Sequence, residues 1–242
     1  MSVARKTAIV TGASQGIGAG IVKRFVERGF NVVANSRKMT QSTEVAASRQ
    51  VALVDGHIGE PATAARIVET ALSRFKSIDA LVNNAGIFFT KPFTDYTAED
   101  FKSLVSTNVE GFLYVTQLSV KQMLAQKTGG SIVTITAALA TNPIAGVKAS
   151  VPMITKGGLD TITKHLAIEY AKDGIRFNAV APGVVDTPLH SNDPKEALQS
   201  LNPMGVLSTV TDIVDAVMYL TEADTVTGEI LYVDGGSHLG RW

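Results

Sequence analysis

Cysteine is absent from this 242-residue chain, tryptophan occurs once, and neither sign of charge is in excess. Without cysteine the chain can form no disulfide, no thiolate nucleophile and no zinc–thiolate centre, and we predict no metal site. Lys and Arg together number 22, as do Asp and Glu, so no electrostatic attraction to nucleic acid or to an anionic membrane is expected.

Long apolar runs are also missing. No stretch reaches the roughly 18 apolar residues that a membrane span requires, and the segment Met1–Lys6 leads directly into a short apolar run, which leaves no room for a signal peptide. We therefore expect a cytoplasmic protein. With 45% hydrophobic residues and no linker, repeat or low-complexity tract, residues 1–242 are predicted to form a single domain with one sizeable core.

Short apolar runs alternate with segments of helical spacing along the whole chain. Runs with almost no polar alternation are typical of strands buried on both faces, as in a parallel sheet covered by helices. The fold class predicted is therefore α/β, a doubly wound (Rossmann), mostly parallel sheet of about seven strands with helices on both faces. The predicted strands are Thr7–Val10, Asn31–Ala34, Val51–Val54, Ala80–Val82, Ser131–Ile135, Arg176–Val180 and Ile230–Val233, and predicted helices include Ile17–Phe25, Ala64–Phe75, Phe101–Gln126 and Leu159–Lys172.

The first run ends in a glycine-rich turn, Thr11-Gly12-Ala13-Ser14-Gln15-Gly16-Ile17-Gly18, and a helical pattern follows it. A strand, a glycine-rich turn and a helix in this order open a dinucleotide-binding unit. The unpaired N–H groups and the positive dipole end of the helix suit a pyrophosphate. Glycine is needed there because a Cβ would strike the turn, the cofactor or the neighbouring strand.

Three further blocks follow in order, and with the glycine-rich turn they carry a family resemblance: Asn83-Asn84-Ala85-Gly86, Asn178-Ala179-Val180-Ala181-Pro182-Gly183 and Tyr232-Val233-Asp234-Gly235-Gly236. This order and spacing resembles the short-chain dehydrogenase/reductase family in its compact single-domain form. The resemblance implies hydride transfer between NAD(P)(H) and an alcohol or carbonyl compound. It also implies a homotetramer, with a homodimer as the runner-up, and the apolar spacing of Phe101–Gln126 and of 152–172 on more than one face favours such assembly.

The resemblance also assigns a cofactor site. The phosphates would lie against the glycine-rich turn, the adenosine ribose beside the 84–86 segment, and the nicotinamide near residues 183 and 187. The 57–58 pair aligns with an Asp–aliphatic pair that holds adenine in relatives, although a surface-loop histidine is an equal alternative. The cofactor residues so implied are Gly12, Ser14, Gln15, Gly16, Ile17, Gly18, His57, Ile58, Asn84, Ala85, Gly86, Lys156, Gly183 and Thr187.

The end of the second predicted strand distinguishes NAD from NADP in such folds, because a carboxylate there binds the ribose 2′-OH and repels a 2′-phosphate. Here the chain reads Ser36-Arg37-Lys38 and has no acid. Arg37 can give a charge-assisted fork to a phosphate and Ser36 can add a hydroxyl donor. NADP(H) is therefore favoured over NAD(H), although Gln15 is neutral where many NADP-preferring relatives carry a basic residue. The segment 37–50 is short for a strand–helix–strand connection, which predicts an open adenine pocket.

The family reaction uses a Tyr acid, a Ser that steadies the carbonyl oxygen, a Lys that lowers the Tyr pKa and holds the ribose, and an Asn in a proton relay. Asn108 and Lys156 match the Asn and the Lys. Pro152 stands four residues before Lys156, where the Tyr is expected, and Ala137 best matches the Ser. Thr136 precedes it and is predicted to point to the opposite face of the strand.

Few other groups can replace the missing acid. A lysine of ordinary pKa near ~10.4 is a weak acid at neutral pH. His190 and Lys148 are further candidates that favour a surface role, and His165 favours a structural one. The predicted substrate pocket is apolar, which favours an apolar or bulky small molecule as the substrate. The pocket includes Ala137, Leu139, Pro152, Met153 and Val184, and further wall residues are Phe88, Phe89, Ile144 and Leu189.

Two functions are consistent with these residues. The first is an NAD(P)(H)-dependent oxidoreductase for an alcohol/carbonyl pair, with an atypical site that lacks the Tyr acid and the Ser. The second is a non-catalytic NADP(H)-binding protein that serves as a sensor, regulator or silent subunit.

Overall fold

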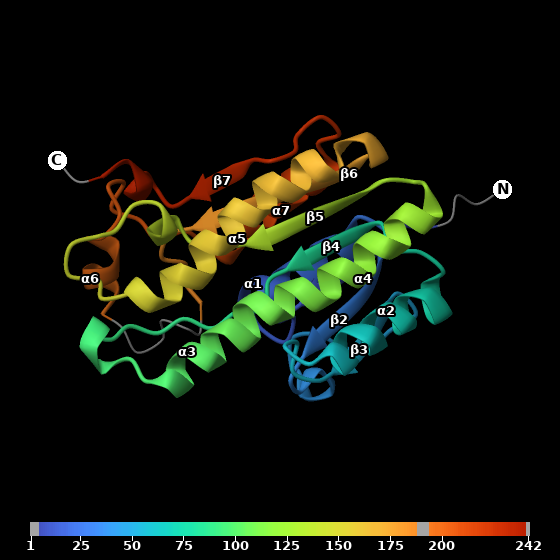
Figure 1. Cartoon of the computed structure of the whole chain (residues 1–242), viewed down its shortest axis with the longest axis horizontal. Coiled ribbons are helices and arrows are strands. Elements are labelled where there is room, and N and C mark those ends of the chain that lie inside the picture. Colours follow the sequence, from blue (N-terminus) through green and yellow to red (C-terminus); the bar gives the residue numbers. More distant parts are fainter. Residues whose placement is uncertain (1–4, 188–193, 241–242) are drawn as a thin grey trace.

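Seven parallel strands form one sheet in the order β3-β2-β1-β4-β5-β6-β7 in the computed structural model, which describes residues 5–187 and 194–240 (Figure 1). Every neighbouring pair in the sheet is parallel. This order confirms the predicted doubly wound α/β class. The strands are β1 (Thr7–Thr11), β2 (Asn31–Ser36), β3 (Val51–Asp55), β4 (Ala80–Asn83), β5 (Gly130–Ile135), β6 (Ile175–Pro182) and β7 (Ile230–Val233).

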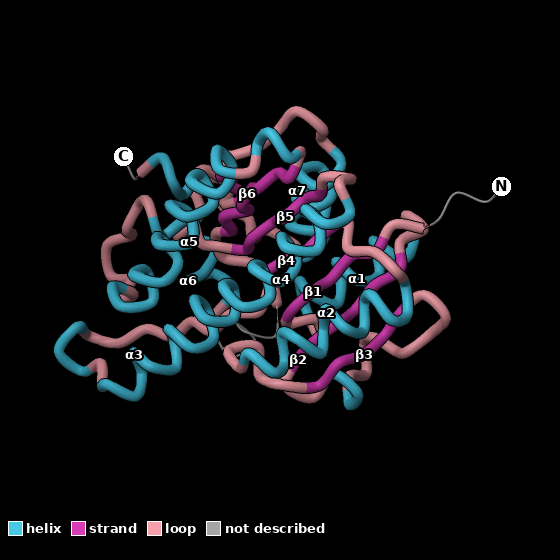
Figure 2. Tube along the Cα trace, turned by 45° about the vertical axis from the view of Figure 1, so that its right-hand side comes forward, coloured by secondary structure: helices cyan, strands magenta, loops and turns pink. Residues whose placement is uncertain are grey.

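Helices cover both faces of the sheet, as predicted, and successive residues of a strand contribute to different cores. In β1, Ala8 and Val10 pack in the core beneath α1 (Gly16–Glu27) and α7 (Val210–Glu222). Ile9 packs in the opposite core, beneath α2 (Pro61–Phe75), α4 (Gly111–Gln126) and α5 (Ser150–Glu169). In Figure 1, α4 and α5 cross in front of the sheet. Figure 2 shows this helical layer and the sheet behind it after a 45° turn.

The connection between β2 and β3 contains no α-helix. A short 3-10 helix, η1 (Met39–Gln41), and an extended loop take its place. Met39 and Val45 are buried in the core on the α1 side of the sheet. These two side chains cover the apolar surface that a helix between β2 and β3 would otherwise cover. The Asp55 carboxylate at the end of β3 accepts hydrogen bonds from the backbone N–H and the hydroxyl of Thr40, which fixes η1.

The predicted helix Phe101–Gln126 is divided into three parts. It comprises α3 (Ala98–Leu104), a π-helical turn η3 (Val105–Glu110) and α4. A π-helical turn widens a helix locally and is frequently found at functional sites. Here the wide turn carries Asn108 into the interior, where 2% of its surface is exposed.

The remaining elements lie at the carboxyl ends of the strands or near the surface. In Figure 1 the arrowheads of β4, β5 and β7 point to the same end of the molecule. Within the described ranges, none of the helices is both long and apolar enough to cross a membrane. The other short helices are η2 (Phe93–Asp95), η4 (Ala138–Ala140), η5 (Ala171–Asp173), α6 (Lys195–Gln199) and η7 (Ser237–Leu239).

Candidate active site

The glycine-rich turn is locked against the segment that follows β4. The Thr11 hydroxyl accepts hydrogen bonds from the N–H groups of Asn84 and Ala85, over 3.1 and 3.0 Å. The Asn84 amide in turn donates to the carbonyl oxygens of Thr11 and Gly12, each over 3.0 Å. A Cβ on Gly18 would collide with the Gly12 carbonyl oxygen, so the close approach requires glycine.

Two glycines of this turn have backbone conformations that other residues rarely adopt. Gly12 has φ +64° and Gly16 has φ +57°. The helix α1 begins at Gly16, so its free N–H groups lie at the turn, as a pyrophosphate site requires. The chain is therefore shaped here for a phosphate-bearing ligand.

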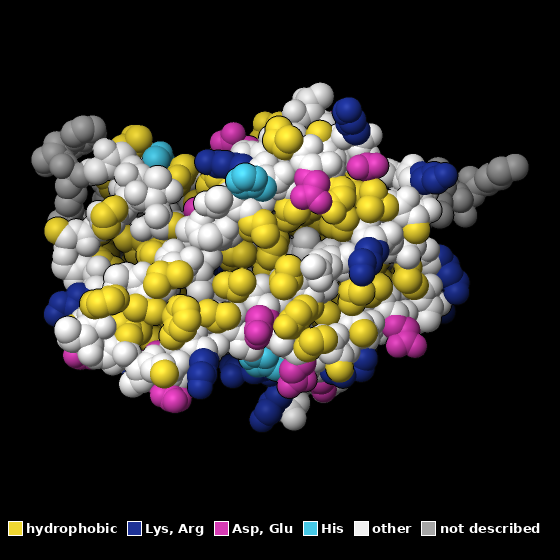
Figure 3. Space-filling model, viewed as in Figure 1, with side chains coloured by type: hydrophobic (Ala, Val, Ile, Leu, Met, Phe, Trp, Pro, Cys, Tyr) yellow, Lys and Arg dark blue, Asp and Glu magenta, His cyan; other side chains and the backbone are white. Residues whose placement is uncertain are grey.

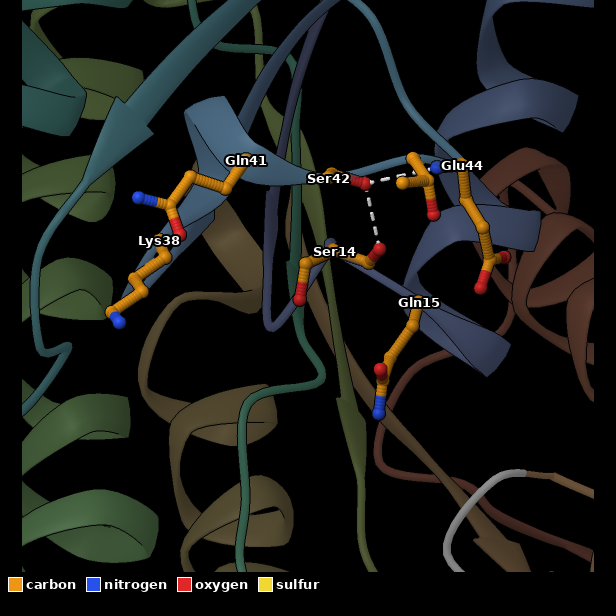
Figure 4. A pocket seen from close by; sticks show the side chains of 7 residues that line it. Ser14, Gln15, Lys38, Gln41, Ser42 and Glu44 are labelled. Atoms are coloured by element: carbon orange, nitrogen blue, oxygen red, sulfur yellow. Dashed lines mark hydrogen bonds between the residues drawn. The ribbon is translucent and has the colours of Figure 1, made fainter.

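A cavity of about 250 Å³ lies between the glycine-rich turn and the loop that replaces the helix after β2 (Figure 4). The Ser42 hydroxyl donates to the Ser14 carbonyl oxygen over 2.7 Å and ties the two segments together. Lys38 and Glu44 stand at opposite ends of the cavity, so it presents one charge of each sign. Its lining residues are Ser14, Gln15, Lys38, Gln41, Ser42, Thr43 and Glu44.

Two basic residues follow β2, and they differ in their relation to this cavity. Arg37 is exposed and is not among the described residues that line the cavity, whereas Lys38 is. Ser36 is half-buried at the end of β2. Lys38 could have been found from the absence of a helical pattern in 37–50, because a loop that folds back on the turn brings its first residues to the ligand.

His57 is anchored rather than free on a surface loop. Its Nδ1 accepts a hydrogen bond from the Gly59 N–H over 3.1 Å, so the neutral ring carries its proton on Nε2, which lies 3.3 Å from the Thr107 hydroxyl. Ile58 is 5% exposed and packs in the core on the α4 side. Its side chain therefore serves the core, and only its backbone is available to a ligand.

Asn108 is held by hydrogen bonds on both sides of its amide. Its Oδ1 accepts from the Ile87 N–H over 2.8 Å, and its Nδ2 donates to the Ile87 carbonyl oxygen over 3.1 Å. The same Nδ2 donates to the Thr155 hydroxyl over 3.0 Å, and that hydroxyl donates to the Pro152 carbonyl oxygen over 2.7 Å. Asn108 thus joins the wide turn η3 to the first turns of α5.

Lys156 and Asn108, the two residues predicted to be catalytic, converge on Gly86. A Cβ built on Gly86 would lie 3.2 Å from the Lys156 Nζ and 3.3 Å from the Asn108 Oδ1. The Lys156 Nζ donates to the Ile135 carbonyl oxygen over 2.8 Å, and 8% of the residue is exposed. Burial lowers the pKa of Lys156 to about 8, against a smaller opposing effect of Asp160. This corrects the expectation of an ordinary lysine, because the ammonium is a much stronger acid than a solvated one.

Asp160 is a buried acid of this site that sequence reasoning missed. It lies on α5 one turn after Lys156 and is 9% exposed. Burial raises the pKa of Asp160, and a hydrogen bond with the Thr136 hydroxyl and the charges of Lys156 and Lys164 oppose that rise. An acid four residues after a candidate catalytic lysine, on the buried side of the same helix, is the signal that could have revealed it.

The positions expected to carry the Ser and the Tyr hold no hydroxyl. Ala137 is half-buried just after β5, and Pro152 is buried in the first turn of α5, where proline is tolerated. Thr136 is buried, and its hydroxyl lies 3.4 Å from the Val180 carbonyl oxygen as well as beside Asp160, so its side chain is turned toward α5 and not away from the site.

The other predicted residues are distributed around this centre. Lys148 and His165 are exposed, so neither belongs to the buried polar group, and Leu189 and His190 lie outside the described residues. The Tyr232 hydroxyl lies 2.8 Å from the Thr141 hydroxyl, in the connection between Ala137 and Lys156. Half-buried residues of the predicted substrate pocket and cofactor site are Leu139, Met153, Val184, Gly183, Thr187, Phe88, Phe89 and Ile144.

With this geometry established, comparison with known proteins identifies the class. A family model described as enoyl-(acyl carrier protein) reductase matches residues 12–238. A tropinone reductase homolog of Arabidopsis thaliana is 36% identical over 95% of this chain and 92% of its own length. A 3beta-hydroxysteroid dehydrogenase of Eggerthella lenta is 33% identical over 97% of this chain and 94% of its own length. The chain belongs to the short-chain dehydrogenase/reductase family of oxidoreductases.

Solved structures agree with that assignment. The 3-ketoacyl-(acyl-carrier-protein) reductase of Brucella melitensis in complex with NADH superposes with a TM-score of 0.90 at 32% identity, covering 96% of this chain and 98% of that one. ElxO with bound NADP has a TM-score of 0.88 at 25% identity, covering 98% of this chain and all of that one. The glycine-rich turn, the cavity beside it and the open position at Gly86 fit a nicotinamide dinucleotide in this chain too.

Proposed function

We propose that this protein is an NADP(H)-dependent oxidoreductase for an alcohol/carbonyl pair, in which Lys156 takes over the proton transfer that a tyrosine performs in the family. The observation that carries the proposal is the buried Lys156 ammonium beside Gly86, with its pKa lowered to about 8. An acid whose pKa lies near the working pH is suited to general acid catalysis.

The chain's residues divide the work between binding and proton transfer. When bound, NADPH supplies a hydride to the carbonyl carbon of the substrate. One of the three N–H groups of the Lys156 ammonium donates a hydrogen bond to the Ile135 carbonyl oxygen, which leaves two N–H donors free for ligands. One of them can hold the nicotinamide ribose, as the family resemblance implies, and the other can give its proton to the carbonyl oxygen of the substrate.

Asn108 and Thr155 keep this arrangement in place. The hydrogen bonds of Asn108 to Ile87 and to Thr155 join the segment beside Gly86 to the helix that carries Lys156. Because Ala137 offers no hydroxyl to the carbonyl oxygen, we expect slower turnover than in relatives with a complete site. Loss of one such donor costs about 10²- to 10³-fold in rate.

The preference for NADP(H) rests on the basic segment after β2 and on the cavity next to it. Lys38 lines the cavity, Arg37 precedes it and no carboxylate stands at the end of β2. A 2′-phosphate would therefore meet two basic side chains and the Ser36 hydroxyl. Glu44, at the opposite end of the cavity, works against this preference.

The second candidate function is a non-catalytic NADP(H)-binding protein. The observation in its favour is that Ala137 and Pro152 stand where the family mechanism has its two hydroxyls, whereas the glycine-rich turn keeps the glycines that its close packing requires. Single-turnover oxidation of bound NADPH against a panel of apolar ketones and aldehydes separates the two. Turnover that Lys156→Met reduces at least 100-fold, and that Lys172→Met leaves unchanged, supports the enzyme. Binding of NADPH without turnover of any panel member supports the second candidate.

Assembly into a homotetramer, with a homodimer as the runner-up, is part of the proposal. Apolar side chains gather over α3, α4 and α5 on the face seen in Figure 3. Exposed apolar side chains of these helices are Phe101 of α3, Leu113 and Leu124 of α4, and Ile154 and Ile168 of α5, with Ile168 81% exposed. Tyr219 on α7 is 56% exposed on the opposite layer, which favours a second contact.

Sedimentation of two variants tests this assembly. Ile168→Asp should lower the mass in solution, whereas Met204→Asp, at a site outside α4 and α5 that is 71% exposed, should leave it unchanged. A wild-type monomer at micromolar concentration would contradict the proposal. A cytoplasmic location stays a prediction.

A further inference from the structure

Lys156 and Asp160 form a buried pair of opposite charges on one helix. They stand four residues apart on α5, which places them on the same side of the helix one turn from each other. Lys156 is 8% exposed and Asp160 is 9% exposed. Both point away from solvent, at the end of β5.

The surroundings of Asp160 leave its carboxylate short of partners. The Thr136 hydroxyl at the end of β5 hydrogen-bonds to it, and Lys164 lies one turn further along α5. Its Oδ1 is buried and has no hydrogen-bond partner among the described residues. A buried carboxylate with an unsatisfied oxygen destabilises a fold unless a nearby charge compensates for it. A packing role alone does not explain an acid at this position, because a leucine would fill it without that cost.

We propose that Asp160 is a positioning residue for Lys156, whose buried carboxylate keeps the lysine side chain charged at the pH at which the enzyme works. This inference rests on the proposed function of Lys156 as the proton donor. It assigns Asp160 no contact with the substrate or the cofactor.

The electrostatics of the site set the direction of the effect. Burial lowers the pKa of Lys156, and the Asp160 carboxylate opposes that fall. If the carboxylate becomes an amide, the buried ammonium loses its countercharge and releases its proton at lower pH. A nearby opposite charge typically shifts a pKa by about one to three, and here no direct ion pair joins these two described side chains, so we expect the lower end of that range. The Lys156 ammonium would then lose its proton at neutral pH rather than at a higher pH, and the enzyme would lack its proton donor there.

The experiment is a titration of Lys156 in the full-length protein, read by NMR of ¹³C-labelled lysine with the signal assigned from Lys156→Met. Wild type is compared with Asp160→Asn, with Thr136→Val and with the control Asp173→Asn, an exposed aspartate after the same helix. We expect the Lys156 midpoint to fall by about one pH unit in Asp160→Asn. We expect a smaller fall in Thr136→Val and none in Asp173→Asn.

Two further readings separate this inference from the proposed function. The rate of NADPH oxidation in wild type should be constant at low pH and decline as the pH rises through about 8, and in Asp160→Asn the decline should move with the NMR midpoint. A shifted midpoint in a protein that turns over no substrate supports the pairing and contradicts the proposed function. An unchanged midpoint in both Asp160→Asn and Thr136→Val overturns the inference, whatever the activity.

Discussion

The Nζ of Lys156 lies 2.8 Å from the carbonyl oxygen of Ile135, the last residue of β5. This bond fixes the end of a long side chain at the carboxyl end of β5, beside Gly86. It also helps to explain how the Lys156 ammonium can remain charged although it is buried. One ammonium proton is hydrogen-bonded to the backbone, and Asp160 supplies a countercharge.

Replacing Lys156 should therefore stabilise the cofactor-free protein while it abolishes activity. The difference between the ordinary pKa of 10.5 and about 8 corresponds to about 3 kcal/mol of stability lost at neutral pH. The lost bond to Ile135 offsets about 1 kcal/mol of that gain. Lys156→Met should raise the free energy of unfolding at pH 7 by about 2 kcal/mol, as measured in urea.

The pH dependence of the stability difference between Lys156→Met and wild type tests whether burial of the ammonium is its cause. The folded pKa of Lys156 lies below the unfolded one, so the unfolded chain binds more protons between pH 8 and 10.5 and wild-type stability gains a rising contribution across that window. The gain from Lys156→Met should shrink as the pH rises through the same window. A variant less stable than wild type at pH 7 would show that Lys156 is not strained by burial.

Cofactor preference should depend on the loop that replaces the helix after β2. Lys38→Ala and Arg37→Ala should each weaken NADPH binding about 5- to 10-fold, since each removes a charge-assisted contact to a phosphate worth about 1 kcal/mol. NADH binding should not change, and Glu44→Gln should strengthen NADPH binding. Fluorescence titration with both cofactors measures this, with Lys127→Ala at the end of α4 as the control. Equal wild-type affinities for NADPH and NADH would contradict the predicted preference.

Arg176 should be a strong determinant of stability far from the site. Its guanidinium donates to the carbonyl oxygens of Leu220 and Thr221, each over 2.6 Å, and so caps the end of α7 from β6. Arg176→Met would remove the guanidinium from both carbonyls, leaving the Leu220 oxygen only a 3.4 Å contact with the Ser131 hydroxyl, and should cost about 2 to 4 kcal/mol. The matched change Arg28→Met removes only an exposed ion pair with Glu222 and should cost less than about 1 kcal/mol. Urea unfolding of both variants measures the difference, and equal losses would refute the capping role.

The sequence predicted the elements that follow strong periodic patterns. All seven strands and the helices α1, α2, α4 and α5 were found from buried apolar runs and helical spacing, whereas α7 (Val210–Glu222) was not among the predicted helices. Lys156 and Asn108 were identified from motifs, and the structure brings both to Gly86.

What could not be predicted depends on three-dimensional neighbours. The π-helical turn that buries Asn108 leaves no signature in a continuous helical pattern. The low pKa of Lys156 follows from burial against β5, which a local sequence does not record. Lys38 lines the cavity only because Met39 and Val45 anchor the loop in the core, and Asp160 matters only because it shares a buried helix side with Lys156.

The most demanding prediction concerns the two missing hydroxyls. We expect wild-type protein to reduce ordinary ketones and aldehydes slowly, and the double variant Ala137→Ser with Pro152→Tyr to reduce them faster. A tyrosine acid contributes about 10²- to 10⁴-fold and a second donor to the carbonyl oxygen about 10²- to 10³-fold. The combined gain should be smaller than their product, since groups that act together are not additive. Steady-state assays with a panel of carbonyl compounds measure it.

The matched control is Ala137→Ser with Pro152→Phe, which makes the same change in size without the phenolic hydroxyl. Pro152 is buried in the first turn of α5, so a larger side chain disturbs the packing in both variants alike. A gain confined to the tyrosine variant would identify the site as an ordinary one that has lost its acid. Fast wild-type turnover that Lys156→Met abolishes, with no gain from the tyrosine, would instead show that the buried lysine is a complete replacement for it.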